Sequence, residues 1–189
     1  DHADIFDDTD AIIRSFHHVV RIIPNNGIII YNKDDKNIKK LLKKGVWSKT
    51  ISFSTSLRAN ADWVLLQKDK YILMGNSRKY EIMSSLIGLH NYKNISLALI
   101  AAKVTGISFK KSIEAIKNFK GVKRRMEFVG SINNMNIYDD FAHHPTEVEN
   151  SILSLKRKFK GKKVLAICEI KSNSMISGIH KDNLIKALN

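Results

Sequence analysis

The chain has 189 residues, 43% of them hydrophobic, which is enough for one large domain or two small ones. Its formal charge of +14 would allow a nucleic-acid partner, but the lysines are scattered and greatly outnumber the arginines, so we expect no nucleic-acid binding. The longest apolar runs fall far short of the roughly 20 residues that span a bilayer, so we expect no membrane partner.

The first half of the chain predicts an α/β layer architecture. Asp8 is a candidate N-cap for a helix whose apolar residues recur at helical spacing, in one core-facing stripe, until Pro24 stops it. The continuously apolar run 27–31 suits a strand covered on both faces of a parallel sheet. The further expected elements are a helix at 35–44, a strand at 50–54, a hairpin at 63–67 and 71–74 that 80–83 could extend, and helices at 91–104 and 108–118.

The second half predicts the start of another α/β sheet after a linker at 119–125. We expect a hairpin of strands 127–132 and 136–139 that turns at Asn133 and Asn134, a helix at 145–159 and an apolar strand at 164–169. The single cysteine, Cys168, lies in that last strand and is expected to be a buried, inert thiol. Because one parallel-type strand cannot make a covered sheet, this second domain looks incomplete.

Four segments carry residues with chemical potential, and each also has a plainer interpretation. Asp1-His2-Ala3-Asp4 could ligate a divalent metal or could stabilise a helix N-terminus. His90 and Asn91 stand at a helix start, where they could meet a nucleotide or simply cap the helix. Arg125, in the linker, could reach a phosphate when domains close or could be a solvated basic residue.

The fourth segment runs from Tyr138 to Glu147, where a predicted strand ends and a predicted helix begins. Ligands of α/β sheets bind at such carboxyl ends of strands. The segment contains Asp140, His143 and His144, so it is unusually rich in titratable groups.

The order of these motifs, D-H-A-D, G-x-H-N-x-x-N, F-x-G-V-K-R-R-x-E and Y-D-D-F-A-H-H-P-T-E, resembles the Mur ligases over the whole chain. The segment C-E-I-K-S-N-S-M at 168–175 is most similar to the subgroup of murein peptide ligases, although Lys171 and Ile170 stand where that subgroup has arginine and proline. By this resemblance, residues 1–120 are the later part of a central ATPase domain and residues 121–189 the first part of a Rossmann-like C-terminal domain. Since the chain begins at Asp1 rather than methionine, we expect a piece of a longer protein.

The resemblance implies an ATP- and Mg²⁺-dependent bacterial cytoplasmic ligase. Such an enzyme joins UDP-N-acetylmuramate to the murein tripeptide L-alanyl-γ-D-glutamyl-meso-diaminopimelate through an acyl phosphate. The alternatives are a ligase that adds L-alanine to the same sugar nucleotide and, from a different class, a basic nucleic-acid-binding module. The chain contains no G-x-x-x-x-G-K-[ST] loop to cradle ATP phosphates, so we predict no ligase activity from this polypeptide alone.

The resemblance also assigns roles to individual residues. His2 would bind Mg²⁺, and His143 and His144 are tentative catalytic residues. A second group would contact the nucleotide: His90, Asn91, Arg125 and Asp140. A third group would recognise the acidic end of the incoming peptide: Lys171, Ser172, Asn173 and Met175.

Overall fold

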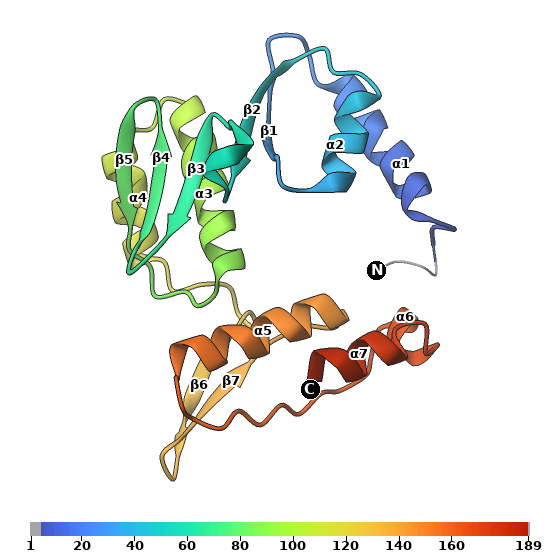
Figure 1. The fold of residues 1–189 in the computed structure, drawn as a ribbon, viewed down its shortest axis with the longest axis vertical. Helices are drawn as coiled ribbons and strands as arrows, with labels where there is room; N and C mark the ends of the chain where they lie inside the picture. Colours follow the sequence, from blue (N-terminus) through green and yellow to red (C-terminus); the bar gives the residue numbers. More distant parts are fainter. Residues whose placement is uncertain (1–4, 189) are drawn as a thin grey trace. The chain divides into compact units, whose positions relative to one another are not determined.

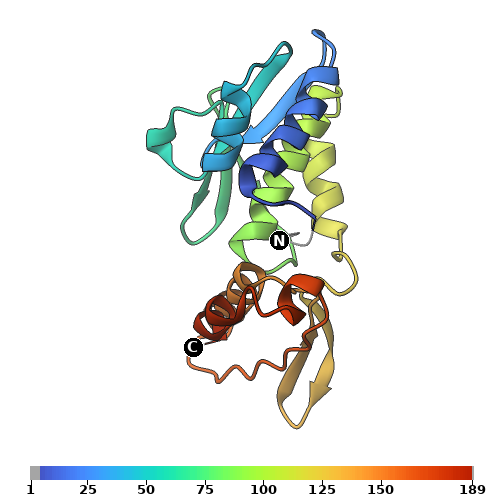
Figure 2. The same ribbon diagram turned by 90° about the vertical axis from the view of Figure 1, so that its right-hand side faces the viewer.

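The computed structural model describes residues 5–188, which form two compact units (Figures 1 and 2). The larger unit holds residues 6–84 and 92–118. The smaller unit holds residue 5, residues 85–91 and residues 119–188. Within the described range, no helix combines the length and the apolar character that crossing a membrane requires.

The larger unit is built on a five-stranded sheet in the order β1-β2-β3-β4-β5 (Figure 1). Strands β1 to β3 are parallel, and β4 and β5 continue the sheet in antiparallel fashion. The strands are β1 (Ile28–Asn32), β2 (Lys49–Ser54), β3 (Trp63–Gln67), β4 (Tyr71–Gly75) and β5 (Arg78–Ile82). The helices are α1 (Thr9–Ile22), α2 (Lys36–Lys43), α3 (Leu89–Val104) and α4 (Phe109–Asn118), with a 3-10 turn η1 (Leu57–Ala59). The expected elements of this half are confirmed with small shifts at their ends.

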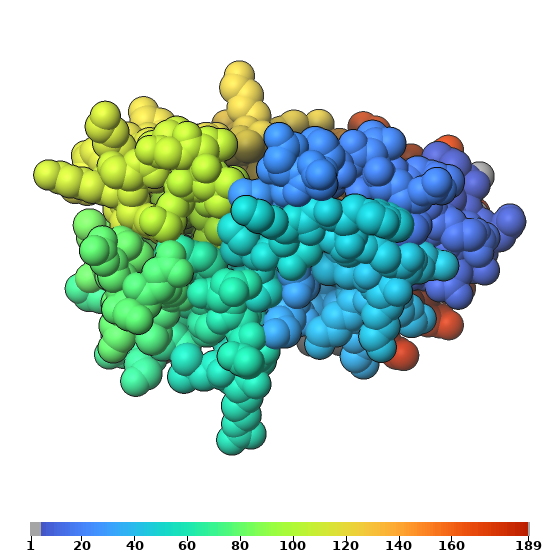
Figure 3. All heavy atoms as spheres, turned by 90° about the horizontal axis from the view of Figure 1, so that it is seen from above, coloured from blue at the N-terminus to red at the C-terminus, as the bar shows by residue number. Residues whose placement is uncertain are grey.

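Helix α1 begins where its cap predicts, because the Asp8 carboxylate accepts a hydrogen bond from the Ala11 amide at 2.6 Å. Its apolar stripe is covered only in part. Val20 is buried, whereas Phe16 and Val19 are 57% and 53% exposed. Figure 3 shows the blue segment that contains α1 at the surface of the larger unit. The expectation of a single core-facing stripe is therefore too simple, since several of its members face outward.

Strand β1 lies at one edge of the sheet, next to β2. Ile28 is exposed and the other four residues are half-buried. The expectation that this strand is covered on both faces is therefore wrong for the described part of the chain. An apolar run favours a strand, but burial of both faces needs two packed layers, and the sequence of the run does not supply them.

The core of the larger unit lies where helices α3 and α4 pack on one face of strands β3 to β5. Trp63 on β3 is 3% exposed and stacks on Phe109 of α4, with ring centroids 5.1 Å apart. Gly75 on β4 lies opposite Trp63, and a Cβ atom added to it would sit 2.4 Å from the indole ring. Alternate residues of a strand share a face, so the buried Leu65 and Leu73 extend this apolar surface.

Two carboxylates fasten loops of the larger unit to strand β2. Asp62 accepts hydrogen bonds from the amide of Ser52 at 2.7 Å and from its hydroxyl at 2.6 Å, and these bonds hold the pKa of Asp62 below its ordinary value. Asp34 accepts hydrogen bonds from the Ser54 hydroxyl and from the Thr55 amide. Burial raises the pKa of Asp34, but these hydrogen bonds outweigh it and the pKa is lowered overall. Both carboxylates are therefore structural anions.

The smaller unit contains the expected hairpin. Strand β6 (Glu127–Ile132) pairs antiparallel with β7 (Met135–Asp139). The turn residues Asn133 and Asn134 have φ angles of +49° and +62°. A two-residue hairpin turn of type I′ needs positive φ at both positions, and asparagine tolerates it well. The local sequence thus determines this turn.

Three helices follow the hairpin: α5 (Pro145–Lys158), α6 (Asn173–Ile176) and α7 (Lys181–Leu188). Helix α5 was expected, and its first residue is proline, which needs no hydrogen-bond acceptor there. Helices α5 and α7 pack together through the buried side chains of Val148, Ile152 and Leu184. This small cluster is the core that holds the site described below.

The strand expected at 164–169 is not formed. The chain runs there as an irregular trace between α5 and α6 (Figure 2). Leu165 and Ile167 are 80% and 91% exposed, and Cys168 is exposed as well. Both the strand and the buried thiol are therefore wrong predictions for this structure. A strand is stabilised by hydrogen bonds to a neighbour, and no strand of the described chain pairs with this segment.

Candidate functional site

The loop from β7 into α5 carries three of the predicted site residues, at the carboxyl end of a strand as expected. Asp140 accepts hydrogen bonds from the Ser151 hydroxyl on α5 and from the Ala142 amide, the latter at 3.2 Å. Ser151 lies 11 residues after Asp140 in the sequence and was not among the predicted site residues. Together the two donors fix the orientation of the Asp140 carboxylate.

Glu147, in the first turn of α5, joins Arg125 and His143. Its Oε1 lies 3.6 Å from Nη1 of Arg125, and its Oε2 lies 3.8 Å from Nδ1 of His143. Oε2 also accepts a hydrogen bond from the His143 amide at 3.2 Å. Burial raises the pKa of Glu147, but the His143 amide, the His143 ring and Arg125 together lower it. Glu147 is therefore an anion that positions the linker guanidinium beside the β7–α5 loop.

Arg124 is a structural neighbour of this cluster. Its φ is +57°, and its amide donates to Glu127 at 2.8 Å. The Arg124 side chain donates to Asp139 at 3.3 Å and lies over the ring of Phe141, 5.1 Å from the centroid. The two linker arginines thus diverge: Arg124 fastens the linker to β7, and Arg125 contacts α5.

His144 has a different environment from His143. It is the N-cap of α5, and its Nδ1 accepts a hydrogen bond from the Thr146 amide at 3.3 Å. Its ring stands edge-on to that of His180, with centroids 4.9 Å apart. Burial and the nearby His180 lower the pKa of His144, so the neutral imidazole is favoured at neutral pH. The two tentative catalytic histidines are thus adjacent in sequence but contact different residues: His143 lies beside Glu147, and His144 lies beside His180.

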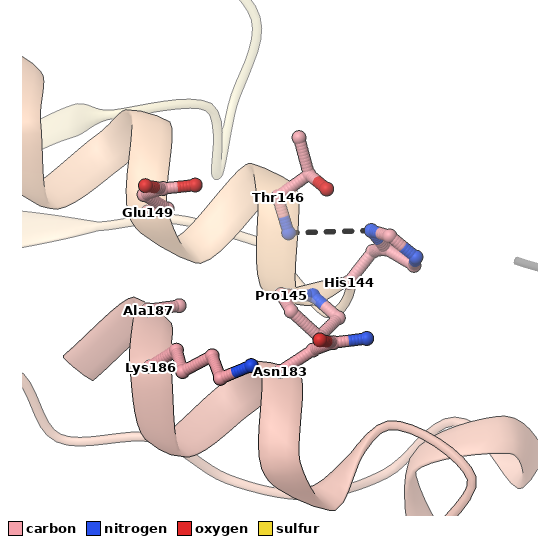
Figure 4. A pocket seen from close by; sticks show the side chains of 7 residues that line it. All are labelled: His144, Pro145, Thr146, Glu149, Asn183, Lys186 and Ala187. Atoms are coloured by element: carbon pink, nitrogen blue, oxygen red, sulfur yellow. Dashed lines mark hydrogen bonds between the residues drawn. The ribbon is translucent and has the colours of Figure 1, made fainter.

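His144 also lines a pocket of about 370 Å³ between α5 and α7 (Figure 4). From α5 and its cap come His144, Thr146 and Glu149. From α7, which the sequence analysis did not foresee, come Asn183 and Lys186. The pocket therefore forms only when α5 and α7 pack together. The motif at 138–147 supplies part of the wall on the α5 side.

The segment predicted to recognise a peptide divides into different environments. Lys171 is exposed and pairs with the exposed Glu169 at 3.1 Å. The hydroxyl of Ser172, the N-cap of α6, is buried and has no hydrogen-bond partner among the described residues. Asn173 starts α6 on the surface, and Met175 packs against the cluster that joins α5 and α7. Met175 therefore contributes packing, Lys171 and Asn173 present polar groups at the surface, and the Ser172 hydroxyl is buried.

His90 and Asn91 lie in the first turn of α3, in the part of that helix that belongs to the smaller unit, whereas its residues from Tyr92 on belong to the larger unit. The Asn91 side-chain amide donates to the carbonyl of Ile87 at 2.7 Å, and the Asn91 backbone amide donates to Gly88 at 3.1 Å. Gly88 has a φ of +95°, and a Cβ atom added there would lie 2.4 Å from Oγ of Ser154. The amides of Asn91 therefore close a tight turn before α3, and the nucleotide contact expected of His90 and Asn91 stays a prediction.

His2 lies outside the described residues, so its predicted role as a magnesium ligand has no structural counterpart. Within residues 5–188, no group of three or more His, Cys, Asp or Glu side chains is arranged to hold a metal ion.

The sequence analysis missed Glu147, Ser151 and His180. Glu147 was part of a quoted motif, and its position in the first turn of a helix after two histidines was an available signal. Ser151 and His180 had none, because their contacts with Asp140 and His144 depend on how α5 and α7 pack.

Comparisons with known proteins cover most of the chain. Residues 1–102 match the Mur ligase middle domain, and residues 124–183 match the Mur ligase, glutamate ligase domain. The chain is 35% identical over its full length to UDP-N-acetylmuramate--L-alanyl-gamma-D-glutamyl-meso-2,6-diaminoheptandioate ligase of Haemophilus influenzae, of which it covers 42%. It is 34% identical over its full length to UDP-N-acetylmuramate--L-alanine ligase of Caldicellulosiruptor saccharolyticus, again covering 42% of that protein.

Among solved structures, a murein peptide ligase from Psychrobacter arcticus matches with a TM-score of 0.69 and 36% identity. The match covers 96% of this chain and 39% of that one. The chain thus spans about two fifths of the length of the relatives it resembles.

Proposed function

The chain belongs to the Mur ligase family, and from this premise we propose that it is part of an ATP-dependent ligase that joins L-alanyl-γ-D-glutamyl-meso-diaminopimelate to UDP-N-acetylmuramate. The observation that carries the proposal is the 35% identity to a ligase named for those two substrates, which extends over the full length of the chain and through both Mur ligase domains. The proposed enzyme acts in the bacterial cytoplasm and uses ATP and Mg²⁺. It has no nucleic-acid or membrane partner.

The geometry of the smaller unit supports a role in nucleotide contact for Arg125 and Asp140. Glu147 holds the Arg125 guanidinium by an ion pair at 3.6 Å, and Ser151 orients the Asp140 carboxylate. A preoriented guanidinium suits phosphate, and a preoriented carboxylate suits the hydroxyls of a nucleotide sugar. Arg125 is exposed and Asp140 is half-buried, so both side chains are accessible to a ligand. By the family resemblance, His90 and Asn91 would contact the base.

In such a ligase, ATP supplies a phosphoryl group that activates the muramate carboxylate as an acyl phosphate. This chain's contribution to that step would be charge neutralisation by Arg125 and positioning by Asp140. His2 would hold Mg²⁺. His144, kept neutral at neutral pH, has the correct protonation state to interact with the incoming amine without repelling it.

The second candidate is a ligase that adds L-alanine, since the chain is 34% identical over its full length to an enzyme of that name. The two candidates differ in the amine substrate. The segment Lys171-Ser172-Asn173-Ser174-Met175 favours the tripeptide, because it resembles the peptide-ligating subgroup.

The test is ATP-dependent phosphate release with UDP-N-acetylmuramate, measured with the full-length gene product and with the 189-residue chain. We expect release with the tripeptide, little with L-alanine, and none from the chain alone, which lacks the phosphate-binding loop. Replacing Arg125 by Ala should lower kcat about a hundredfold. Replacing the exposed Arg157 on α5 should leave it unchanged. Release with L-alanine and not with the tripeptide would reject the leading proposal in favour of the second.

A further inference from the structure

The pocket between α5 and α7 is large enough for a small molecule. Its volume of about 370 Å³ lies within the roughly 300–1,000 Å³ of typical ligand pockets. Its two walls belong to helices that are joined by the buried side chains of Val148, Ile152 and Leu184. Because packed helices hold their backbones in fixed positions, the polar groups on them are presented in a defined arrangement.

Two opposite charges line this pocket from different helices. Glu149 comes from α5 and Lys186 from α7 (Figure 4). Both residues are exposed, and across residues 5–188 neither side chain forms a hydrogen bond or an ion pair, with the other or with a third residue. Lys171, by contrast, is already paired with Glu169 at 3.1 Å. A cation and an anion that face one cavity without pairing suit a ligand that carries both charges.

The other polar groups of the pocket add no net charge. Nδ1 of His144 accepts a hydrogen bond from the Thr146 amide, which places the ring proton of the neutral imidazole on Nε2. Asn183 offers one carbonyl oxygen and two N–H donors. The pocket therefore combines one positive group, one negative group and neutral hydrogen-bonding groups, which matches an amino acid better than a simple anion or a simple amine.

We propose that this pocket binds the ammonium and carboxylate of a free α-amino acid end, with Lys186 contacting the carboxylate and Glu149 the ammonium. The identity of the ligand rests on the proposed function: a diaminopimelate residue linked through one amino group keeps an ammonium and a carboxylate on its other end. L-Alanine, once it is the attacking amine, offers no second such end. Lys186 and Glu149 are thus residues that distinguish the tripeptide from L-alanine.

Isothermal titration calorimetry of the 189-residue chain tests this binding without ATP or sugar nucleotide. The probes are meso-diaminopimelate, pimelate, which lacks both ammonium groups, and 1,5-diaminopentane, which lacks both carboxylates. Diaminopimelate should bind at least about tenfold more tightly than either analogue, the ratio expected for one recognised charge. Equal binding of an analogue, or no binding of diaminopimelate, overturns the inference and leaves the proposed function to its own assay.

Charge reversal locates the binding. Lys186→Glu and Glu149→Lys should each weaken diaminopimelate binding at least about tenfold, and the double reversal should restore much of it, since the ligand can turn around. Lys186→Met supplies a second, uncharged variant. Lys181→Glu, on the same helix outside the pocket, is the matched control and should bind as the unaltered chain does. If Lys186→Glu and Lys186→Met bind diaminopimelate as tightly as Lys181→Glu, the pocket is not the site. In the full-length enzyme, the same reversal should raise KM for the tripeptide and leave kcat unchanged.

Discussion

The two compact units differ in how far the apolar side chains of their strands and apolar segments are buried. In the larger unit, Trp63, Leu65 and Leu73 on paired strands are buried under α3 and α4. In the smaller unit, Val129 on β6 is 63% exposed and Leu165 is 80% exposed. The runs at 27–31 and 164–169 are both mainly apolar, yet the first forms strand β1 and the second is irregular. An apolar run therefore becomes a strand where a neighbouring strand supplies hydrogen bonds, and its side chains are buried only where a further layer covers them.

The largest effect on stability is expected when the Trp63 ring is removed from the core of the larger unit. Trp63→Ala should lower the free energy of unfolding by about 3–5 kcal/mol, because the residue is 3% exposed and its loss leaves a cavity against Phe109. Trp47→Ala is the control and should cost less than about 1 kcal/mol, since Trp47 is 57% exposed. Urea denaturation followed by circular dichroism measures both. Equal losses would show that the larger unit has no dominant core.

A smaller loss of unfolding free energy is expected when the core of the smaller unit is altered. Leu184→Ala should cost about 2–3 kcal/mol, since Leu184 is 9% exposed and joins α7 to Val148 and Ile152. The effect should be local, with faster amide hydrogen exchange in α5 and α7 and unchanged exchange in β1 to β5. Ile185→Ala, which alters the 51% exposed neighbour, should leave exchange unchanged. Faster exchange throughout the chain would mean that the two units unfold together.

The hydrogen bonds of Asp62 predict an acid-dependent effect on the larger unit. Asp62→Asn should cost about 1 kcal/mol at pH 7, because the carboxylate accepts two hydrogen bonds from Ser52. The folded-state pKa lies below the ordinary value of 3.8, so this stability is complete above that value and is lost as the pH falls through the lowered pKa. The difference between the variant and the unaltered chain should therefore shrink at low pH. A difference that stays constant down to pH 2 would contradict the role of the charge.

The smallest effect on stability is expected in the unpaired segment. Ile167→Lys should change the free energy of unfolding by less than about 0.5 kcal/mol, because Ile167 is 91% exposed. It should also reduce self-association measured by sedimentation velocity, since a charge disrupts an exposed apolar segment that could pair with another chain. Ile152→Lys, in the buried cluster, should instead destabilise the smaller unit strongly. If Ile167→Lys is as destabilising, the segment is not open in solution.

The sequence identified parts of the candidate site that depend on local chemistry. Arg125, Asp140, His143 and His144 were found because they stand in a linker or at a strand-to-helix junction, where backbone geometry places side chains predictably. Their partners were harder to find. Ser151, for example, meets Asp140 because α5 folds back over the loop.

By itself, the sequence determined the elements whose stability is local: the Asp8 cap of α1, the turn at Asn133 and Asn134, and the first residue of α5. It also determined the family, through the order of its motifs. Tertiary structure alone decided that Glu147 pairs with Arg125, that Met175 packs against the α5–α7 cluster and that Lys186 and Glu149 share a pocket. It also decided that residues 164–169 have no strand partner within residues 5–188. The reason is that caps and turns are satisfied by neighbours along the chain, whereas ion pairs, pockets and sheets need groups that are distant in sequence.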